Sequence, residues 1–396
     1  MTAKSMMPYV EGNSAIRAMF EEGARMAKEF GKENVYDFSL GNPSVPAPPE
    51  VNQAIRDILD EEDSLMIHGY NQSNSGYEDV RTVVAEHLNA LHGTSFTSNN
   101  IIMTVGAASG LNVALKTLLD PGDEVLAFAP YFVEYGNYAK NHGGVLKAIP
   151  PCFPTFQPNL EALEQEITEK TQAVIINSPN NPTGVIYSEE TLQRLASLLE
   201  KKSAEIGHPI FIISDEPYRE LAYDGAVVPY VTKYYRNTIV GYSWSKSLSL
   251  PGERIGYLVI PSEADDFENM ITAADIANRV LGYVNAPTLI QRVAARCINC
   301  STDIDAYDRN RKALYEGLID AGFECTKPEG AFYLFVKSPI EDDVEFCALA
   351  KKHHILVVPG RSFACPGYVR MAYCVSYDTI VNSLPHFKAL MEEIRG

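Results

Sequence analysis

The sequence reads SWSKSLSLPGERIGY from Ser243 to Tyr257. Apolar, β-branched runs at Thr238–Tyr242 and Ile255–Ile260 lie on either side and predict two strands joined by a turn that carries Lys246. The turn also holds two hydroxyls and a guanidinium, groups that bind phosphate, beside an amine that can form an imine. These residues indicate a site for a phosphorylated carbonyl cofactor, although a polar turn with one solvated lysine shows the same pattern.

Length and composition predict a globular chain that binds a small molecule. The 396 residues, 46% of them hydrophobic, suffice for two domains or for one large α/β domain with an appendage. The 51 acidic and 33 basic residues give a formal charge of −18, which repels nucleic acid and anionic lipids, so neither is expected as a partner. No apolar run reaches the ~20 residues of a membrane helix, and residues 1–20 lack a signal-peptide core, so a cytoplasmic location is expected.

The cysteine pattern predicts neither disulfides nor a metal site. Seven cysteines are spread through the chain, and an odd number does not fit a disulfide framework. Cys297 and Cys300 form a CxxC pair, but 289–298 has the apolar spacing of a helix and no second ligand pair accompanies them. Buried helical thiols are the preferred interpretation.

Strands and helices alternate from Ile101 onward. A strand at Ile101–Val105, a helix at Ala107–Leu119 and a strand at Glu124–Ala129 are joined by short connections. Buried strands follow at Ala173–Asn177 and Phe211–Ser214. This alternation predicts an α/β fold with a mostly parallel sheet covered by helices.

The C-terminal part predicts a smaller α+β domain. Three helices are expected over Glu263–Arg279, Pro287–Ile298 and 303–321, and three short strands over Gly330–Val336, Ile355–Val358 and Tyr368–Tyr373. A helix within 11–30 is expected to pack on this unit. The predicted domains are therefore a large one at 46–289 and a discontinuous small one formed by 1–45 with 290–396.

Several chemically useful groups follow the predicted strands. Asp215 ends a buried strand, where a carboxylate is costly to desolvate unless it meets a positive partner. Small residues at 105–110 start a helix whose free N–H groups could hold a phosphate, or they only allow tight packing. Phe132 could stack on a flat ring or fill the core. Ligands of α/β sheets bind at the edge where the carboxyl ends of the parallel strands meet, so a single site is expected at that edge.

Two polar segments precede the sheet. Leu40–Pro49 contains four prolines and predicts an ordered crossing segment. Its Gly41 could bring a backbone N–H to a ligand carboxylate or could simply form a turn. The loop His68–Tyr77 carries aromatic side chains and is otherwise typical of a solvated loop.

Four motifs occur in a characteristic order: Asn181-Pro182-Thr183-Gly184, Asp215-x-x-Tyr218, Ser243-x-Ser245-Lys246 and Arg254. With them the chain resembles, over nearly its whole length, the class I/II aminotransferases, in particular the aspartate and aromatic aminotransferases. These are pyridoxal-phosphate enzymes of fold type I, so the resemblance implies a mostly parallel, seven-stranded-type sheet with a smaller α+β domain. Ala107-Ala108 and Arg361 depart from the family, where a hydroxyl and a small residue are usual.

The resemblance implies roles around pyridoxal 5′-phosphate. Lys246 would form the aldimine with the cofactor and then carry the proton between the substrate α-carbon and the cofactor. Asp215 would keep the ring nitrogen protonated, so that the ring accepts electrons. Tyr218 and Asn181 would bind the phenolic oxygen, and Phe132 would stack on the ring.

The resemblance also implies contacts at the two charged ends of the ligands. The phosphate would be held by the N–H groups of Ala107 and Ala108, by Ser243, Ser245 and Arg254, and by Tyr70 from the other subunit of a homodimer. The substrate α-carboxylate would be bound by Arg370 with Gly41 and Asn181, since a planar guanidinium suits a carboxylate. The departure at Ala107-Ala108 suggests phosphate contacts from the backbone, and Arg361 bears on access to the site.

The expected activity is transfer of an amino group from an L-α-amino acid to a 2-oxo acid, with aspartate or glutamate first and aromatic amino acids next. A dicarboxylate needs a second cation, for which Arg279, Arg361 or a partner residue is available. An aromatic substrate would suit the aromatic side chains Tyr70, Tyr77, Phe132, Tyr135 and Phe332.

Two alternatives stay open. A C–S β-lyase on the same fold would share the cofactor contacts and differ in which α-bond lies perpendicular to the ring. A non-catalytic, pyridoxal-phosphate-binding regulator is more remote. Such a regulator is expected to carry a DNA-binding module, and the short segment before Gly41, in a chain that is acidic overall, leaves little room for one.

Overall fold

A seven-stranded sheet forms the centre of the larger part of the molecule, with strand order β2-β8-β7-β6-β5-β3-β4. The computed structural model describes residues 2–11 and 15–396. The strands are β2 (Ile101–Thr104), β3 (Glu124–Phe128), β4 (Val145–Ile149), β5 (Thr171–Asn177), β6 (Phe211–Asp215), β7 (Thr238–Ser243) and β8 (Gly256–Val259). In this sheet β8 runs antiparallel to β2 and β7, and the other neighbours pair in parallel. The predicted α/β fold is confirmed.

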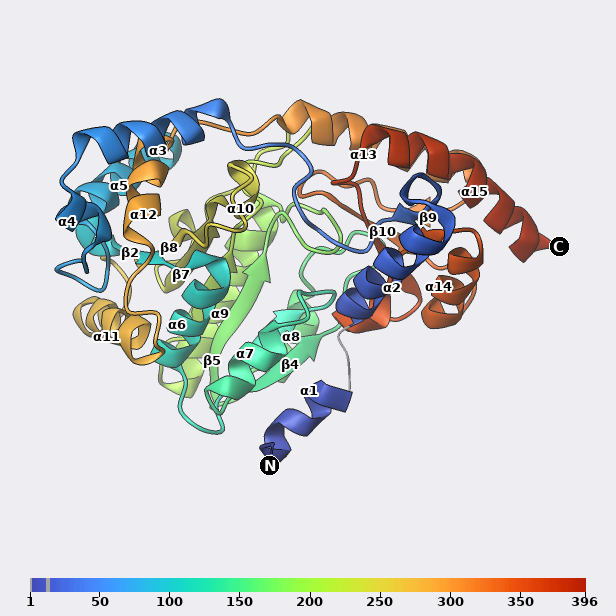
Figure 1. Ribbon diagram of the computed structural model, residues 1–396. Helices are drawn as coiled ribbons and strands as arrows, with labels where there is room; N and C mark the ends of the chain where they lie inside the picture. Colours follow the sequence, from blue (N-terminus) through green and yellow to red (C-terminus); the bar gives the residue numbers. More distant parts are fainter. Residues whose placement is uncertain (1, 12–14) are drawn as a thin grey trace.

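The sheet is buried on both faces because its inner strands are apolar over most of their length. Along β5, Val174 and Ile176 pack into one hydrophobic cluster, while Ala173 and Ile175 pack into the cluster on the opposite face. Helices α6 (Gly106–Leu118) and α11 (Phe267–Val280) contribute to the second cluster, and α8 (Leu160–Glu166) and α9 (Glu189–Ile206) to the first. Figure 1 shows these helices around the sheet.

A third group of helices covers the end of the sheet at β2 and β8. Its members are α3 (Pro49–Glu61), α4 (Ser64–His68), α5 (Glu78–His92) and α12 (Thr288–Arg296). Val51 of α3, Val84 of α5 and Val293 of α12 share one core cluster with Ile101 and Val259. The remaining helices of this part are α7 (Tyr135–Asn141) and the short α10 (Trp244–Ser247).

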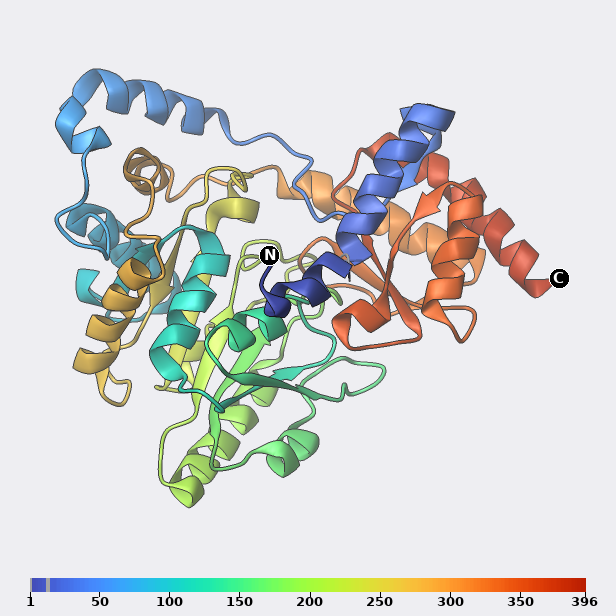
Figure 2. The same cartoon turned by 60° about the horizontal axis from the view of Figure 1, so that its bottom comes forward.

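The second part is built on a four-stranded antiparallel sheet, β12-β13-β10-β9. Its strands are β9 (Glu324–Cys325), β10 (Tyr333–Lys337), β12 (Val358–Pro359) and β13 (Tyr368–Ala372). The parallel pair β1 (Tyr36–Asp37) and β11 (Ile355–Leu356) lies beside it, with helices α13 (Ile304–Ala321), α14 (Asp343–Lys352) and α15 (Tyr377–Arg395). Figures 1 and 2 show this part next to the larger one.

The N-terminal segment packs on the second part. Met26 of α2 (Ala15–Phe30) contacts Leu356, and Glu22 pairs with Lys351 at 3.1 Å. A short helix, α1 (Met7–Glu11), precedes it, and residues 12–14 lie outside the described residues. These contacts agree with a discontinuous small domain, so we keep as a proposal the division into 46–289 and 1–45 with 290–396. Because α12 packs on α3 and α5, a boundary after α12 fits better than one at 290.

Three local predictions need correction. Lys246 lies in the helix α10 instead of a simple turn, because the Ser243 side chain accepts the N–H of Ser245 and starts a helical turn. The single strand expected at Ile355–Val358 is two short strands that join different sheets. Cys297 and Cys300 lie just after α12, in a turn closed by the N–H of Cys300 and the carbonyl of Cys297 (2.9 Å).

Metal-binding clusters and membrane-spanning helices are both absent from the described residues. Across 2–11 and 15–396, no three or more His, Cys, Asp or Glu side chains are grouped so as to hold a metal ion. Within the same residues, no helix is both long enough and apolar enough to cross a bilayer.

Candidate active site

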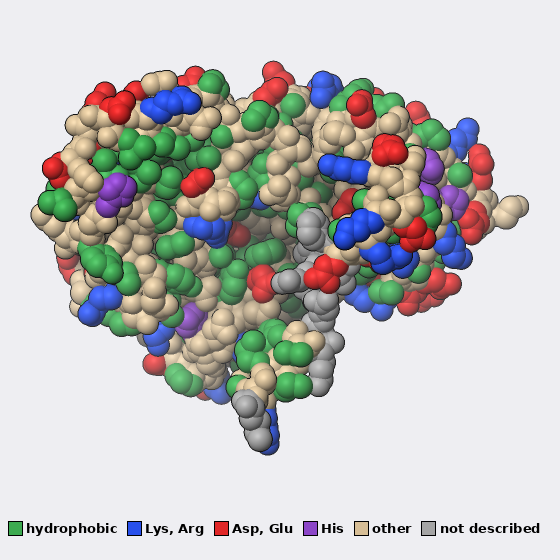
Figure 3. All heavy atoms as spheres, in the orientation of Figure 1, with side chains coloured by type: hydrophobic (Ala, Val, Ile, Leu, Met, Phe, Trp, Pro, Cys, Tyr) green, Lys and Arg blue, Asp and Glu red, His purple; other side chains and the backbone are tan. Residues whose placement is uncertain are grey.

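A cavity of about 310 Å³ lies at the edge of the seven-stranded sheet where the parallel strands end. Residues that follow β2, β5, β6 and β7 line it from the larger part, and Tyr333 and Arg370 line it from the second part. In the space-filling view the surface is hollowed between the two parts (Figure 3). The side chains of Asp215, Lys246 and Arg254 meet here, as expected of the switch from strand to loop in an α/β sheet.

Lys246 is held in the cavity by its neighbours in α10 and by the crossing segment. Its Nζ donates a hydrogen bond to the carbonyl of Gly41 (3.0 Å) and lies 5.0 Å from the ring centre of Phe332. Burial lowers the pKa of Lys246 to about 8, and the cations Arg370 and Arg254 act in the same direction. A usable fraction of this amine is therefore neutral near neutral pH.

Asp215, the last residue of β6, keeps one carboxylate oxygen free for a ligand. Oδ2 accepts a hydrogen bond from the hydroxyl of Tyr135 (2.6 Å), while Oδ1 is buried without a partner. Burial raises the pKa of Asp215 to about 7, against the effect of the Tyr135 hydrogen bond. A protonated ring nitrogen at Oδ1 would supply the missing partner and favour the carboxylate form.

The start of α6 and Arg254 form a candidate anion site. Gly106 has φ of 78°, and a Cβ there would come within 2.8 Å of the Arg254 guanidinium. Arg254 donates to the carbonyls of Pro251 (3.0 Å) and Val105 (3.4 Å), which fixes it beside the free N–H groups of the helix. Ala107, Ala108, Ser243 and Ser245 line the same end of the cavity, and the two serine hydroxyls are 2.7 Å apart.

Arg370 offers a guanidinium fork at the other end. It is 2% exposed on the central strand β13, between the rings of Tyr333 (4.6 Å) and Phe363 (4.9 Å). Nη1 donates to Asn181 Oδ1 (3.2 Å) and Nη2 to the Ser39 carbonyl (2.6 Å), whereas Nε is buried without a partner. The spare donor suits a carboxylate.

The middle of the cavity is aromatic and amide-rich. The hydroxyl of Tyr218 lies 3.0 Å from that of Tyr333, and the N–H of Asn181 donates to Asn177 Oδ1 (2.6 Å). Phe132 lines the cavity from the segment before α7. A flat, phosphorylated ring with a basic nitrogen fits these groups, because every polar end has a matching partner.

Known proteins show which family has this arrangement. The model of the family described as aminotransferase class I and II matches residues 33–384. The chain belongs to this family. It is an aminotransferase, and the resemblance seen in the sequence is confirmed.

The relatives share the length and the fold of this aminotransferase. It is 32% identical to the aspartate aminotransferase of Thermotoga maritima, over 89% of this chain and 90% of that protein. A crystal structure of an amino transferase from Eubacterium rectale is 48% identical, with a TM-score of 0.97 and full coverage of both chains. The aspartate aminotransferase of Thermus thermophilus with maleate is 27% identical, with a TM-score of 0.86 over 98% of this chain and 100% of that chain.

The cavity brings together twelve of the thirteen site residues that the sequence predicts. They are Gly41, Ala107, Ala108, Phe132, Asn181, Asp215, Tyr218, Ser243, Ser245, Lys246, Arg254 and Arg370. Tyr70 is the exception. It is 89% exposed and lines a separate groove with Tyr77, so its predicted role depends on a second subunit.

The two arginines considered for a side-chain carboxylate do not line the cavity of the aminotransferase. Arg361 donates from Nε to Asp343 (2.7 Å) and from Nη2 to Asp342 (2.8 Å), so it ties the 3₁₀ helix η5 (Gly360–Phe363) to the start of α14. Arg279 lies near the end of α11. Within 2–11 and 15–396, the cations lining this cavity are Lys246, Arg254 and Arg370.

Sequence reasoning missed three polar residues of the cavity, Asn177, Tyr138 and Tyr333. Asn177 carried a usable signal, since it is a polar residue at the end of a buried strand. Tyr138 and Tyr333 carried none, because a tyrosine in an apolar pattern also fills cores. Tyr135 was interpreted only as part of an aromatic wall.

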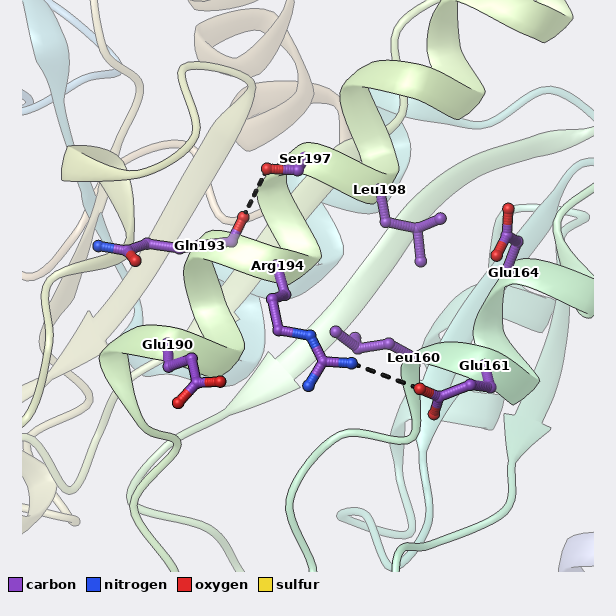
Figure 4. A pocket seen from close by; sticks show the side chains of 8 residues that line it. All are labelled: Leu160, Glu161, Glu164, Glu190, Gln193, Arg194, Ser197 and Leu198. Carbon is purple, nitrogen blue, oxygen red and sulfur yellow. Dashed lines mark hydrogen bonds and ion pairs between the residues drawn. The ribbon is translucent and has the colours of Figure 1, made fainter.

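A second groove, of about 420 Å³, lies between α8 and α9 (Figure 4). Its Arg194 pairs with Glu161 at 3.3 Å, and both side chains are largely exposed. Exposed ion pairs of this kind contribute little to folding stability and do not mark a reactive site. The cavity at the sheet edge is therefore the candidate active site.

Proposed function

We propose that the aminotransferase binds pyridoxal 5′-phosphate in this cavity and moves an amino group from an L-α-amino acid to a 2-oxo acid. The observation that carries the proposal is the meeting of two unusual groups in one cavity. Lys246 is a partly buried amine with a lowered pKa, and Asp215 has a buried oxygen without a partner. Perturbed, incompletely bonded groups of this kind mark chemical sites, and the family uses this cofactor.

Each end of the proposed cofactor has a counterpart. When bound, pyridoxal phosphate supplies a carbonyl group that bonds to amines and a ring that draws electrons from the α-carbon of the amino acid. Arg254, the serine hydroxyls and the first N–H groups of α6 would bind the phosphate. Asp215 would hold the proton on the ring nitrogen, and Tyr218 would donate to the phenolic oxygen.

The chain's own groups also handle the substrate. Arg370 would bind the α-carboxylate through its free Nε–H and its two Nη groups, which orients the α-carbon. Lys246, as the neutral amine, would take the proton from that carbon and return it one position along the conjugated system. Its lowered pKa makes the neutral form accessible at the pH where the reaction runs.

For the substrate side chain, aspartate or glutamate is our first proposal and an aromatic amino acid the second. Relatives of this length are named aspartate aminotransferases, and one of them was crystallised with maleate, a dicarboxylate. The three cations among the described residues of the cavity already have roles. A side-chain carboxylate would therefore meet a cation of the partner subunit, whereas an aromatic side chain would meet Tyr138, Phe132 and Leu111.

We further propose a homodimer in which Tyr70 reaches the phosphate site of the partner. Tyr70 and the neighbouring Leu65 and Met66 are all exposed in this chain, and an apolar patch of this kind suits an interface. Mixing inactive Lys246→Ala protein with an inactive Tyr70 variant should restore part of the activity in hybrid dimers. A monomer that stays fully active at high dilution would refute the shared site.

The test of the activity is a panel of L-amino acids with 2-oxoglutarate and the loaded enzyme. Glutamate should form in a 1:1 ratio with the new 2-oxo acid, fastest with aspartate and next with an aromatic amino acid. Pyruvate and ammonia released from cystathionine without any 2-oxo acid would replace the proposal by a C–S β-lyase.

A further inference from the structure

Tyr135 contacts the carboxylate that is proposed to hold the cofactor ring. It is the first residue of α7 and only 1% exposed, and its hydroxyl donates to Asp215 Oδ2 at 2.6 Å. Its ring stands edge-on to Phe132, with ring centres 5.7 Å apart and planes at 82°. The hydroxyl is thus fixed by the packing of its own ring.

The other groups around Asp215 do not bind its carboxylate. Asn177 donates to the main-chain carbonyl of Asp215 (2.7 Å), and Glu216 is engaged by Ser214 and Arg219. Among residues 2–11 and 15–396, Tyr135 is the one hydrogen-bond partner of the Asp215 carboxylate. The orientation of the two carboxylate oxygens therefore depends on Tyr135.

We propose that Tyr135 is a positioning residue of the reaction: by holding Oδ2 of Asp215, it keeps Oδ1 turned toward the cofactor ring nitrogen and keeps the carboxylate ionised. This inference rests on the proposed binding of pyridoxal phosphate.

The hydroxyl of Tyr135 is needed because the other surroundings of Asp215 favour its protonated form. Burial raises the pKa of Asp215, and the neighbouring Glu216 raises it further, while the Tyr135 hydrogen bond lowers it. Tyr138 from α7 and Tyr218 from the segment after β6 are the other titratable groups whose pKa responds to Asp215, and both stay neutral because burial raises their pKa. Without the Tyr135 hydroxyl, the carboxyl group would be protonated more readily and free to rotate.

The test is Tyr135→Phe, which keeps the packed ring and removes the hydroxyl. A hydrogen bond to a charged group contributes about 1.5–3 kcal/mol, so kcat should fall on the order of ten- to a hundredfold, with KM for the amino acid nearly unchanged because Arg370 is intact. Titration of the apoenzyme with pyridoxal phosphate should show a dissociation constant raised by a similar factor, and the acid limb of the pH–rate profile should move to higher pH.

Two controls separate positioning from general stability. Tyr235→Phe removes another buried hydroxyl, which donates to the Ile210 carbonyl (2.8 Å) away from the cavity, and should leave kcat and cofactor affinity unchanged. In an Asp215→Asn background, Tyr135→Phe should cause little further loss, because both act through one group.

Three results would overturn the inference. They are wild-type kcat and cofactor affinity in Tyr135→Phe, equal losses in Tyr135→Phe and Tyr235→Phe, and additive losses in the double variant. Failure of the proposed function looks different. If the wild type transaminates no amino acid but loads cofactor, the titration still decides the role of Tyr135, and if it binds no pyridoxal phosphate, both proposals fall.

Discussion

Asp215 and Glu216 are neighbours at the end of β6, and both carboxylates are buried. Glu216 pairs with Arg219 at 2.7 Å and accepts the hydroxyl of Ser214 at 2.7 Å. Arg219 in turn lies over the rings of Tyr230 and Tyr242. Asp215 instead has one tyrosine donor and an oxygen without a partner.

This contrast separates a buried charge that serves the fold from one that is available to a ligand. The Glu216–Arg219 pair satisfies its charges internally and lines no part of the cavity, so it serves the fold. Asp215 lines the cavity and keeps bonding capacity for a ligand. Substitutions in the cavity should therefore abolish chemistry and spare stability, and substitutions in the pair should do the reverse.

The largest effect is expected from Lys246→Ala. Activity should fall by at least about a thousandfold, since the variant lacks the amine that bonds and transfers the proton. The visible absorption band that borohydride abolishes in the wild type should be missing, while the unfolding midpoint of the apoenzyme stays the same or rises. Lys201→Ala, at an exposed lysine paired with Glu164, is the matched control. Full turnover without Lys246 would remove it from the mechanism.

Asp215→Asn should lose activity on the order of a thousandfold, because an amide stabilises a protonated ring nitrogen poorly. Its effect on the stability of the apoenzyme has a distinct pH dependence. The folded pKa of about 7 lies above the ordinary value of 3.8 for an aspartic acid, so between these values the folded state holds a proton that the unfolded state has lost. Wild-type stability should fall as pH rises through this window, by about 4 kcal/mol at most, and the amide should remove that slope.

Urea unfolding of both apoproteins at about pH 4.5 and 7.5 measures this pH dependence. If the stabilities of the two proteins changed with pH in the same way, folding would not raise the pKa of Asp215. If Asp215→Asn lowered the rate only a few fold, Asp215 would not stabilise the protonated ring nitrogen.

Arg219→Met should lower the stability of the fold and leave the activity nearly unchanged. It leaves Glu216 buried and unpaired, and breaking such a pair costs about 3–5 kcal/mol of unfolding free energy. The folded fraction should keep its visible band and a kcat within a few fold of wild type. Combining it with Glu216→Gln should restore part of the stability, which denaturant unfolding would detect. If Arg219→Met kept normal stability but lost its activity, the Glu216–Arg219 pair would serve the reaction and not the fold.

Arg361→Ala should have the smallest effect. Its guanidinium is half-exposed, so its pair with the exposed Asp342 contributes only about 1 kcal/mol or less. The buried Asp343 loses the guanidinium but keeps the hydrogen bond from the main-chain N–H of residue 361 (2.8 Å). It holds the η5 turn in which Phe363 covers the Arg370 guanidinium, so KM for the amino acid should rise a few fold while kcat stays constant. Steady-state kinetics with Lys337→Ala as the control would show this, and an unchanged KM would confine Arg361 to the surface.

The sequence predicted most of the sheet and most of the cavity because both follow from local patterns. Buried strands such as β5 and β6 have apolar runs at 173–176 and 211–213, and Asp215 is conspicuous at the end of one of them. Lys246 and Arg254 belong to a motif short enough to recognise. Edge strand β4 was missed because it is partly exposed and lacks the apolar run of its neighbours.

What could not be predicted depends on contacts between distant residues. The hydroxyl of Tyr135 meets a carboxylate eighty residues away, and no spacing reveals that pairing. The four-residue helix α10 is too short to show a period. Tyr70 is exposed in this chain, and its predicted role depends on a second subunit.

The two ends of the cavity come from different stretches of the chain. The groups proposed for the cofactor, such as Asp215, Lys246 and Arg254, follow strands of the seven-stranded sheet, whereas Arg370 belongs to the four-stranded sheet. Changes in the C-terminal unit can therefore alter the binding of the α-carboxylate, which all amino acids share, without disturbing the lysine proposed to bond to the cofactor. A chimera that takes residues 300–396 from a relative with another substrate should keep the cofactor and this chain's preference among amino acids, because the side chain would meet Tyr138, Phe132 and Leu111 or the partner subunit.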